Sequence, residues 1–459
     1  MSTPDQQPRE APPEKKQRQS ASAAIPGLQR SDEYIRRDSE AITPSLTRTY
    51  PFVMDHGRGS KVWNVEGAEF VDFTAGLAVT STGHSHPLVV QAIKDQADKF
   101  IHMSGTDFYY PVQIELAERI NALVPGPEAK QCLFTNSGTE ALEAAFKLAR
   151  YHTGRPRAIA FLGAFHGRSM GALSLTASKY VQREGFAPLI PGVHHVPYGY
   201  CYRCSYNLSY PACDVHCVKY IEEVLFKRLV PAKEVAAIFM EPVQGEGGYV
   251  VPPPLFHERL AELAHKYGIL LVDDEVQAGM GRTGKMFAIE HWSAVPDIVC
   301  MAKGIASGMP LGAMVARRQI MTWPAGAHAT TFGGNPVSCA AALKTLDLIE
   351  DGYMQNAARM GEAFLERLKR MQTEHRTMGD VRGLGLMVAV ELVENRDTKQ
   401  PAVELRDAVV QRCFQKGLLI LGCGSSCIRF MPALSIELDV VEQGLATFAE
   451  ALSAAEGSH

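Results

Sequence analysis

A carboxylate and an amine that follow two short apolar segments are the strongest chemical signal in the sequence. Residues 269–272 are consecutively apolar, typical of a strand buried on both faces, and Asp274 follows them. Lys303 follows a second apolar run, residues 299–302. If the two strand ends are adjacent, the amine can form a Schiff base with an electrophilic ring cofactor, and the carboxylate can keep a ring nitrogen protonated. A buried Asp–Lys ion pair without chemistry is the alternative reading of these residues.

A candidate phosphate cradle lies earlier in the chain. The segment 132–134 leads to Ser137, Gly138 and Thr139, and a run with helical spacing follows to Tyr151. Glycine lets backbone N–H groups approach an anion, the hydroxyls donate hydrogen bonds, and a helix N-terminus favours negative charge. A plain helix cap would use the same residue types, because serine and threonine are common caps.

These residues need a scaffold that brings strand ends together. Short apolar segments alternate with helical ones through the middle of the chain, which predicts an α/β fold with a mainly parallel sheet covered by helices, plus a smaller α/β domain. We also expect one strand at Gly383–Leu392. The expected domain order is a disordered tail (1–30), an N-terminal segment joining the small domain (31–85), a large cofactor-binding domain (86–345) and a C-terminal small domain (346–459).

Composition narrows the function classes. The chain has 459 residues, 46% apolar and 21% charged, with a net charge of −4. No basic stripe indicates nucleic-acid binding, no apolar run is long enough to span a membrane, and the N-terminus has no secretion signal. We therefore expect a cytoplasmic protein with small-molecule partners.

The segment Asp274-Glu275-Val276-Gln277, the following Gly-x-Gly-Arg-Thr-Gly at 279–284 and Lys303-Gly304 resemble the class III aminotransferases, which use pyridoxal 5'-phosphate. The resemblance covers nearly all of the chain after about residue 40. It implies fold type I, with Lys303 and Asp274 as catalytic residues. It also implies a small-molecule amino donor, a 2-oxo acid acceptor such as 2-oxoglutarate, and a homodimer or higher oligomer with shared active sites.

The same resemblance implies cofactor contacts residue by residue. Phe165 and Val276 would cover the two faces of the ring, His166 would neighbour it, and Gln277 would bind the phenolic oxygen. Thr331 would reach the cofactor of the neighbouring subunit. The implied cofactor-binding set is Ser137, Gly138, Thr139, Phe165, His166, Asp274, Val276, Gln277, Lys303 and Thr331.

For the substrate, the resemblance implies three charged residues. Arg429 matches the arginine that binds an α-carboxylate, and Arg168 matches a position that can meet a distal carboxylate. Glu246 matches the acid that neutralises Arg429 when the substrate is an ω-amine. The resulting expectation is transfer of an amino group from an ω-amino acid or amine, such as 4-aminobutyrate, to a 2-oxo acid.

Cysteines are concentrated in one insertion. Cys201 and Cys204 form a C-x2-C pair, and Cys213 and Cys217 form a C-x3-C pair eight residues later. Zinc, an iron–sulfur cluster, free or redox-labile thiols, and disulfides are all compatible with this spacing, so the metal remains unknown. The insertion resembles a bacterial and archaeal branch that contains 4-aminobutyrate aminotransferases and amino-acid racemases.

Two other functions remain open from sequence. A pyridoxal-phosphate racemase or epimerase could use the same scaffold, returning the proton on the opposite face without an amino acceptor. A non-enzymatic binding protein is disfavoured by the presence of both Lys303 and Asp274.

Overall fold

The computed structural model describes residues 29–457, which divide into two compact units. The first contains residues 29–55 and 63–68, including helix α1 (Gln29–Ala41). Within it, the backbone N–H and the hydroxyl of Ser31 both donate to the Glu66 carboxylate, at 2.7 Å each. The expected disordered tail (1–30) lies almost wholly outside the described residues.

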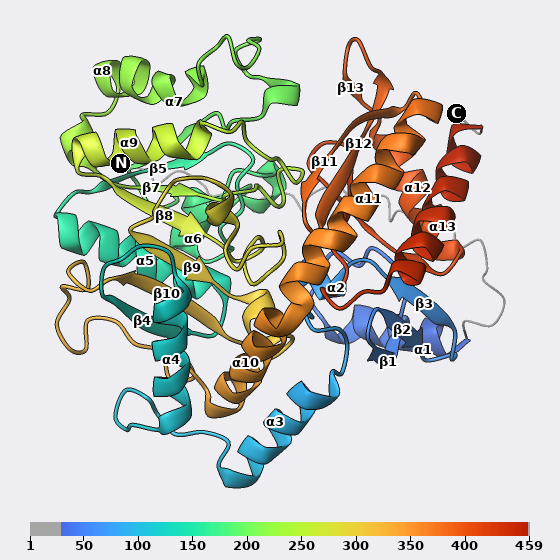
Figure 1. The fold of residues 1–459 in the computed structure, drawn as a ribbon, viewed down its shortest axis with the longest axis horizontal. Coiled ribbons are helices and arrows are strands. Elements are labelled where there is room, and N and C mark those ends of the chain that lie inside the picture. The colour runs from blue at the N-terminus through green and yellow to red at the C-terminus, as the bar shows by residue number, and fades with distance from the viewer. Residues whose placement is uncertain (1–28, 458–459) are drawn as a thin grey trace, which may run out of the picture. The chain divides into compact units, whose positions relative to one another are not determined.

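The second unit (56–62 and 69–457) is built on a seven-stranded sheet in the order β4-β10-β9-β8-β7-β5-β6 (Figure 1). Neighbours from β6 to β9 are parallel, and β10 is antiparallel to both β9 and β4. All residues of β7 and β8 are buried, as expected for strands covered on both faces. The predicted mainly parallel sheet is therefore confirmed. The strands are β4 (Lys130–Thr135), β5 (Arg157–Phe161), β6 (Val193–Val196), β7 (Val235–Met240), β8 (Leu270–Asp274), β9 (Ile298–Met301) and β10 (Gly312–Arg317).

Helix α5 (Gly138–Thr153) packs on this sheet through a continuous apolar face. Ala141 and Leu142 join Phe239 of β7 and Cys300 of β9 in one buried cluster, which fixes the start of the helix above the strand ends. The remaining helices before residue 350 are α2 (Ala75–Ala78), α3 (Pro87–Lys99), α4 (Pro111–Leu123), α6 (Met170–Leu175), α7 (His216–Tyr220), α8 (Phe226–Arg228), α9 (Phe256–Tyr267) and α10 (Pro336–Leu348).

A second, antiparallel sheet follows in the order β11-β12-β16-β15, with β13 pairing to β12. The single strand expected at Gly383–Leu392 is wrong, because the chain reverses at Gly385 and forms a hairpin of β11 and β12. Gly385 has φ 51°, and a Cβ there would meet the Thr283 carbonyl carbon at 2.4 Å, so this turn requires glycine. The elements are α11 (Met354–Glu374), β11 (Met378–Leu384), β12 (Met387–Asn395), β13 (Gln400–Pro401), α12 (Val403–Gln415), β15 (Leu421–Cys423), β16 (Cys427–Phe430) and α13 (Leu438–Glu456).

Three short strands lie between residues 54 and 72. They are β1 (Met54–Arg58), β2 (Lys61–Asn64) and β3 (Glu69–Asp72), and β3 pairs in parallel with β14 (Leu418–Leu419). Within residues 29–457, no helix combines the length and apolarity that crossing a bilayer requires. The domain boundaries at 85/86 and 345/346 stay predictions.

Candidate active site

A cavity of about 410 Å³ opens at the carboxyl ends of the central parallel strands. β8 and β9 are parallel neighbours with Asp274 in register with Cys300, so Asp274 and the segment carrying Lys303 leave the sheet side by side. The predicted residues that line the cavity are Ser137, Gly138, Thr139, Phe165, His166, Arg168, Asp274, Val276, Gln277 and Lys303.

Lys303 begins a 3-10 turn (Lys303–Ala306) directly after β9, with φ 47° in the left-handed region. Such a conformation costs free energy in a non-glycine residue, and neighbouring contacts hold it here. The Ser81 hydroxyl donates to the Gly304 carbonyl at 2.8 Å, and the Thr82 N–H donates to the Ser307 hydroxyl at 3.0 Å. Burial lowers the pKa of Lys303 despite the opposing charges of Asp274 and Glu246, which favours the neutral, nucleophilic amine.

Asp274 is buried and held from two sides. Its Oδ1 accepts the Val276 N–H at 3.0 Å, and its Oδ2 lies 2.7 Å from Nδ1 of His166. Burial lowers the pKa of His166, but the hydrogen bond and charge of Asp274 outweigh this, so the net pKa of His166 is raised. Asp274 therefore presents a fixed carboxylate at the cavity wall.

The adjacent acid, Asp273, does not line the cavity. Successive side chains of a strand point to opposite faces, so Asp273 turns away from the face that Asp274 occupies. Burial raises the pKa of Asp273 well above its ordinary value, and the charges of Glu275 and Asp274 add to the effect. Burial therefore favours the neutral form of Asp273, which makes it a poorer candidate than Asp274 for the charged group of this site.

The start of α5 forms the anion-binding end of the cavity. The Ser137 side chain caps the helix by accepting the Glu140 N–H at 3.5 Å, and the helix runs for 16 residues. A Cβ on Gly138 would lie 2.8 Å from Cγ1 of Val276, so glycine is what allows this turn to approach the ring-binding residues. Free N–H groups, hydroxyls and the positive helix end together fit a phosphate.

The middle of the cavity fits a flat polar ring. Phe165 and Val276 line it, and the side-chain oxygen of Gln277 is buried without a hydrogen-bond partner among the described residues. The Nε2 atom of His166 is unpartnered in the same way. Apolar walls, unsatisfied polar atoms, a carboxylate and a lysine together match the groups of pyridoxal phosphate.

A buried ion pair joins the loop after β7 to the second sheet. Nη1 of Arg429, on β16, lies 2.5 Å from Oε1 of Glu246, and Nζ of Lys179 lies 3.7 Å from Oε2. Burial raises the pKa of Glu246, but Arg429 and Lys179 outweigh it, so the net pKa is lowered and Glu246 stays charged. Neither Glu246 nor Arg429 lines the cavity, although the charges of both act on Lys303.

The other two predicted residues are exposed. Arg168 lines the cavity and places its guanidinium 5.8 Å from the Phe165 ring centre. Thr331 does not line the cavity of its own chain.

Several lining residues were not expected from sequence. They are Asn136, Met309, Pro310 and Leu311. Met309–Leu311 lie only six to eight positions after Lys303, and that proximity was the available signal. Glu241 also lines the cavity and accepts the Phe165 N–H at 3.1 Å.

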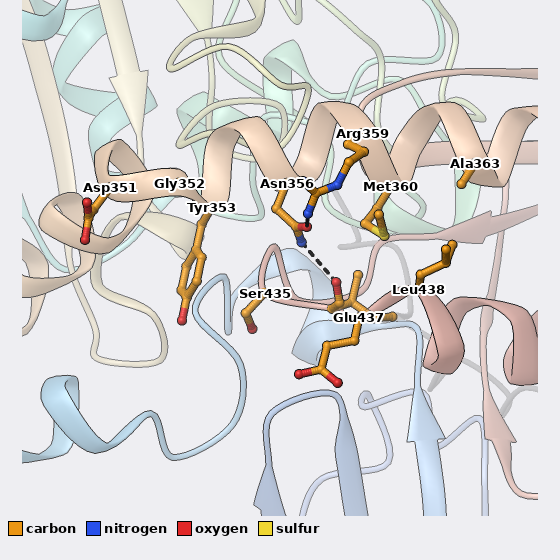
Figure 2. A pocket seen from close by; sticks show the side chains of 11 residues that line it. Asp351, Gly352, Tyr353, Asn356, Arg359, Met360, Ala363, Ser435, Glu437 and Leu438 are labelled. Carbon is orange, nitrogen blue, oxygen red and sulfur yellow. Dashed lines mark hydrogen bonds between the residues drawn. The ribbon is translucent and has the colours of Figure 1, made fainter.

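A second cleft, of about 630 Å³, lies between the start of α11 and residues 435–438 (Figure 2). Asn356 bridges its two sides by donating to the carbonyls of Leu434 at 2.7 Å and Ile436 at 2.9 Å. None of the predicted site residues lines this cleft, and its lining contains no lysine. The chemistry therefore belongs to the smaller cavity.

Comparison with known proteins agrees with this geometry. The family model described as "Aminotransferase class-III" matches residues 43–452. A 5-aminovalerate aminotransferase from Pseudomonas aeruginosa is 39% identical over 92% of this chain and 98% of its own length. A leucine/methionine racemase from Thermococcus litoralis is 38% identical over 93% of this chain and 96% of its own length.

A solved structure extends the match to three dimensions. An amine transaminase from an uncultivated Pseudomonas species, determined in its PLP-bound form, superposes with a TM-score of 0.82. It is 31% identical, and the match covers 90% of this chain and 97% of that one. The chain therefore belongs to the class III aminotransferases and is a pyridoxal-phosphate-dependent transaminase of fold type I.

Proposed function

We propose that the enzyme transfers the amino group of an ω-amino acid, of the 4-aminobutyrate type, to a 2-oxo acid such as 2-oxoglutarate. The observation that carries this proposal is the buried Glu246–Arg429 pair at 2.5 Å. An arginine that is already neutralised leaves room for a substrate without an α-carboxylate. The 5-aminovalerate aminotransferase is consistent with such a donor.

Within this proposal, each cavity residue has one task. Bound pyridoxal phosphate supplies an electron-withdrawing ring that stabilises the carbanion left by proton removal. Asp274 keeps the ring nitrogen protonated, and Lys303 holds the cofactor and then carries the proton on its Nζ atom. Ser137, Gly138 and Thr139 bind the phosphate, Phe165 and Val276 cover the ring, His166 orients Asp274, and Gln277 binds the phenolic oxygen.

The two half-reactions need different carboxylate contacts in one pocket. Glutamate carries an α-carboxylate that the planar fork of Arg429 can bind with two hydrogen bonds, provided that Glu246 moves aside. Lys179, 3.7 Å from Glu246, offers the displaced carboxylate a second cation. We assign Arg168, an exposed residue that lines the cavity, to the distal carboxylate of either substrate.

We further propose a cytoplasmic homodimer in which Thr331 contacts the partner's phosphate. Exposed apolar side chains lie close to Thr331 in the chain or in space: Phe332, the next residue, is 59% exposed, and Ile101, which adjoins His102, is 66% exposed. The ring of Phe332 lies 5.0 Å from that of His102, so these residues belong to one surface. Burying this surface against a second copy would remove an energetically unfavourable apolar patch.

An amino-donor screen tests the proposed substrate class. Purified enzyme is incubated with 4-aminobutyrate, 5-aminovalerate, L-ornithine or L-alanine, with 2-oxoglutarate or pyruvate as acceptor. We expect the ω-amino acids to give the highest kcat/KM. Transamination of α-amino acids alone would contradict the proposal.

Racemisation is the second candidate, because a leucine/methionine racemase is as similar to this chain as the aminotransferase is. Incubation with one L-amino acid and no oxo acid separates the two activities. Accumulation of the D-enantiomer would favour the racemase, whereas a single stoichiometric half-reaction that stops would favour the transaminase.

A further inference from the structure

The four cysteines of the insertion converge on one small pocket, away from the catalytic cavity. Cys201, Cys204, Cys213 and Cys217 all line it, together with Tyr198, Tyr206 and other residues. None of the four is in a disulfide. Residues 201–217 contain only one 3-10 turn (Cys201–Arg203) and the start of α7, so little regular structure holds the cysteines together.

The insertion has two segments, residues 200–204 and residues 213–218, which we call its two limbs. Each limb carries one cysteine pair and is anchored by its own contacts. On the first limb, Tyr200 and Arg203 both hydrogen-bond the buried carboxylate of Glu391 on β12. The second limb continues into α7, where Val218 is buried. The thiols of the two limbs therefore meet across the pocket, but no backbone pairing of strands or helices joins the limbs.

One polar atom at the pocket has no partner. The Tyr206 hydroxyl is buried without a hydrogen bond among the described residues, and Tyr206 lines the pocket beside the cysteines. A hydroxyl donor next to thiolate sulfur is a typical outer contact of a metal centre. This atom supplies an observation independent of the cysteine spacing.

We propose that Cys201, Cys204, Cys213 and Cys217 together ligate one thiophilic metal centre, either a zinc ion or an iron–sulfur cluster, that joins the two limbs of the insertion. Both centres take four cysteine thiolates. In residues 29–457, no three His, Cys, Asp or Glu side chains already stand at metal-binding spacing, so binding requires the thiols to turn inward. Each cysteine can redirect its sulfur by rotation about χ1.

Metal analysis of the full-length holoenzyme tests the proposal. The protein is purified under argon without chelators, and zinc, iron and acid-labile sulfide are measured per chain. We expect either about one zinc, or iron and sulfide in equal amounts at about two or about four per chain. The sulfide assay separates the two centres, because a zinc site contains none.

Cysteine variants test whether the bound metal lies in this pocket. Cys204→Ser and Cys213→Ser, one on each limb, should each lower the metal content at least tenfold. Cys413→Ala is the matched control, because it removes a buried thiol of α12 that does not line the pocket. If a serine variant fails to fold, stripping the wild-type protein with a chelator should lower its Tm, and adding back the same metal should restore it.

Three results would overturn the proposal. One is wild-type protein with no stoichiometric metal and four thiols that react freely with iodoacetamide. Another is a disulfide between any two of the four cysteines in protein purified under argon. The third is metal content unchanged in both serine variants.

Discussion

Two pairs of residues at the catalytic site are held in different ways. We call Asp274 and Lys303 the floor of the cavity, and we call Glu246 and Arg429 its rim. On the floor, Asp274 ends one parallel strand and Lys303 follows the adjacent one, and hydrogen bonds between side chains and backbone groups hold both segments. The rim residues Glu246 and Arg429 do not line the cavity, but their charges act on Lys303. They come from a loop and from a separate antiparallel sheet, and a side-chain ion pair joins them. The floor therefore depends on main-chain geometry, whereas the rim depends on one contact between side chains. Under the proposed function, we expect proton chemistry to depend on the floor and substrate choice to depend on the rim.

The largest expected effect is at the floor. Lys303→Ala removes both the covalent anchor and the proton carrier, so turnover should fall by about 10⁴-fold or more in both half-reactions. The protein should still fold and retain the cofactor weakly through its phosphate. Steady-state rates and cofactor absorbance check this, and turnover within tenfold of wild type would refute the role of Lys303.

The second-largest effect is expected for Asp274→Asn. Its rate should fall by on the order of 10²-fold or more, because a charge-assisted contact to the ring nitrogen is removed. The rates of both half-reactions should fall by similar factors, as expected for a floor residue. Asp273→Asn is the matched control, since burial already favours its neutral form. A larger loss for Asp273→Asn than for Asp274→Asn would show that the acids are assigned wrongly.

A rim substitution should instead separate the half-reactions. Arg429→Ala should slow the reaction with glutamate by roughly 10- to 100-fold, the equivalent of about 1–3 kcal/mol for lost charged hydrogen bonds. The 4-aminobutyrate half-reaction should change less, because that substrate has no α-carboxylate. Stopped-flow rates with each substrate alone provide the measurement. Equal reductions of the two rates would mean that Arg429 acts in the chemistry common to both substrates, as the floor residues do.

Thr331→Val tests whether each cofactor site includes a residue of the second subunit. Thr331→Val should weaken cofactor retention by a few-fold, through loss of one hydrogen bond to phosphate. Mixing it with Lys303→Ala should restore activity, because a mixed dimer then contains one site without either change. No recovery after confirmed subunit exchange would mean that Thr331 serves its own chain.

The smallest effect concerns the stability of the cofactor-free enzyme. Burial raises the pKa of Glu241 to about 7, whereas a glutamate in the unfolded chain titrates near 4.3. The folded state binds this proton more tightly, so stability should fall as pH rises from about 4 to about 7. Glu241→Gln should flatten the pH dependence of Tm, whereas the exposed control Glu394→Gln should not. An unchanged slope in Glu241→Gln would contradict the raised pKa.

The floor was more predictable from sequence than the rim. Four apolar residues before Asp274 and four before Lys303 indicate buried strands, and parallel strands bring their carboxyl ends to one edge. Spacing alone does not pair Glu246 with Arg429, which are 183 residues apart. That pairing was expected only from the family resemblance.

Other features depend on tertiary contacts that no local pattern reports. The Ser81–Gly304 hydrogen bond spans 223 residues and supports the strained backbone of Lys303. The strand predicted at Gly383–Leu392 spans the end of β11, the turn and most of β12, because residues 383–390 contain no polar side chain to mark the turn. There the packing of Gly385 against Thr283 determines the turn.

The most direct test of the division between floor and rim is the ratio of two half-reaction rates in Glu246→Ala. Single-turnover rates are measured by stopped-flow with 4-aminobutyrate alone and with glutamate alone, for wild type and variant. Without Glu246, Arg429 lacks its buried partner, so the 4-aminobutyrate rate should fall while the glutamate rate is unchanged or higher. A proportionate fall in both rates would contradict the account, because Glu246 would then act in the chemistry common to both substrates.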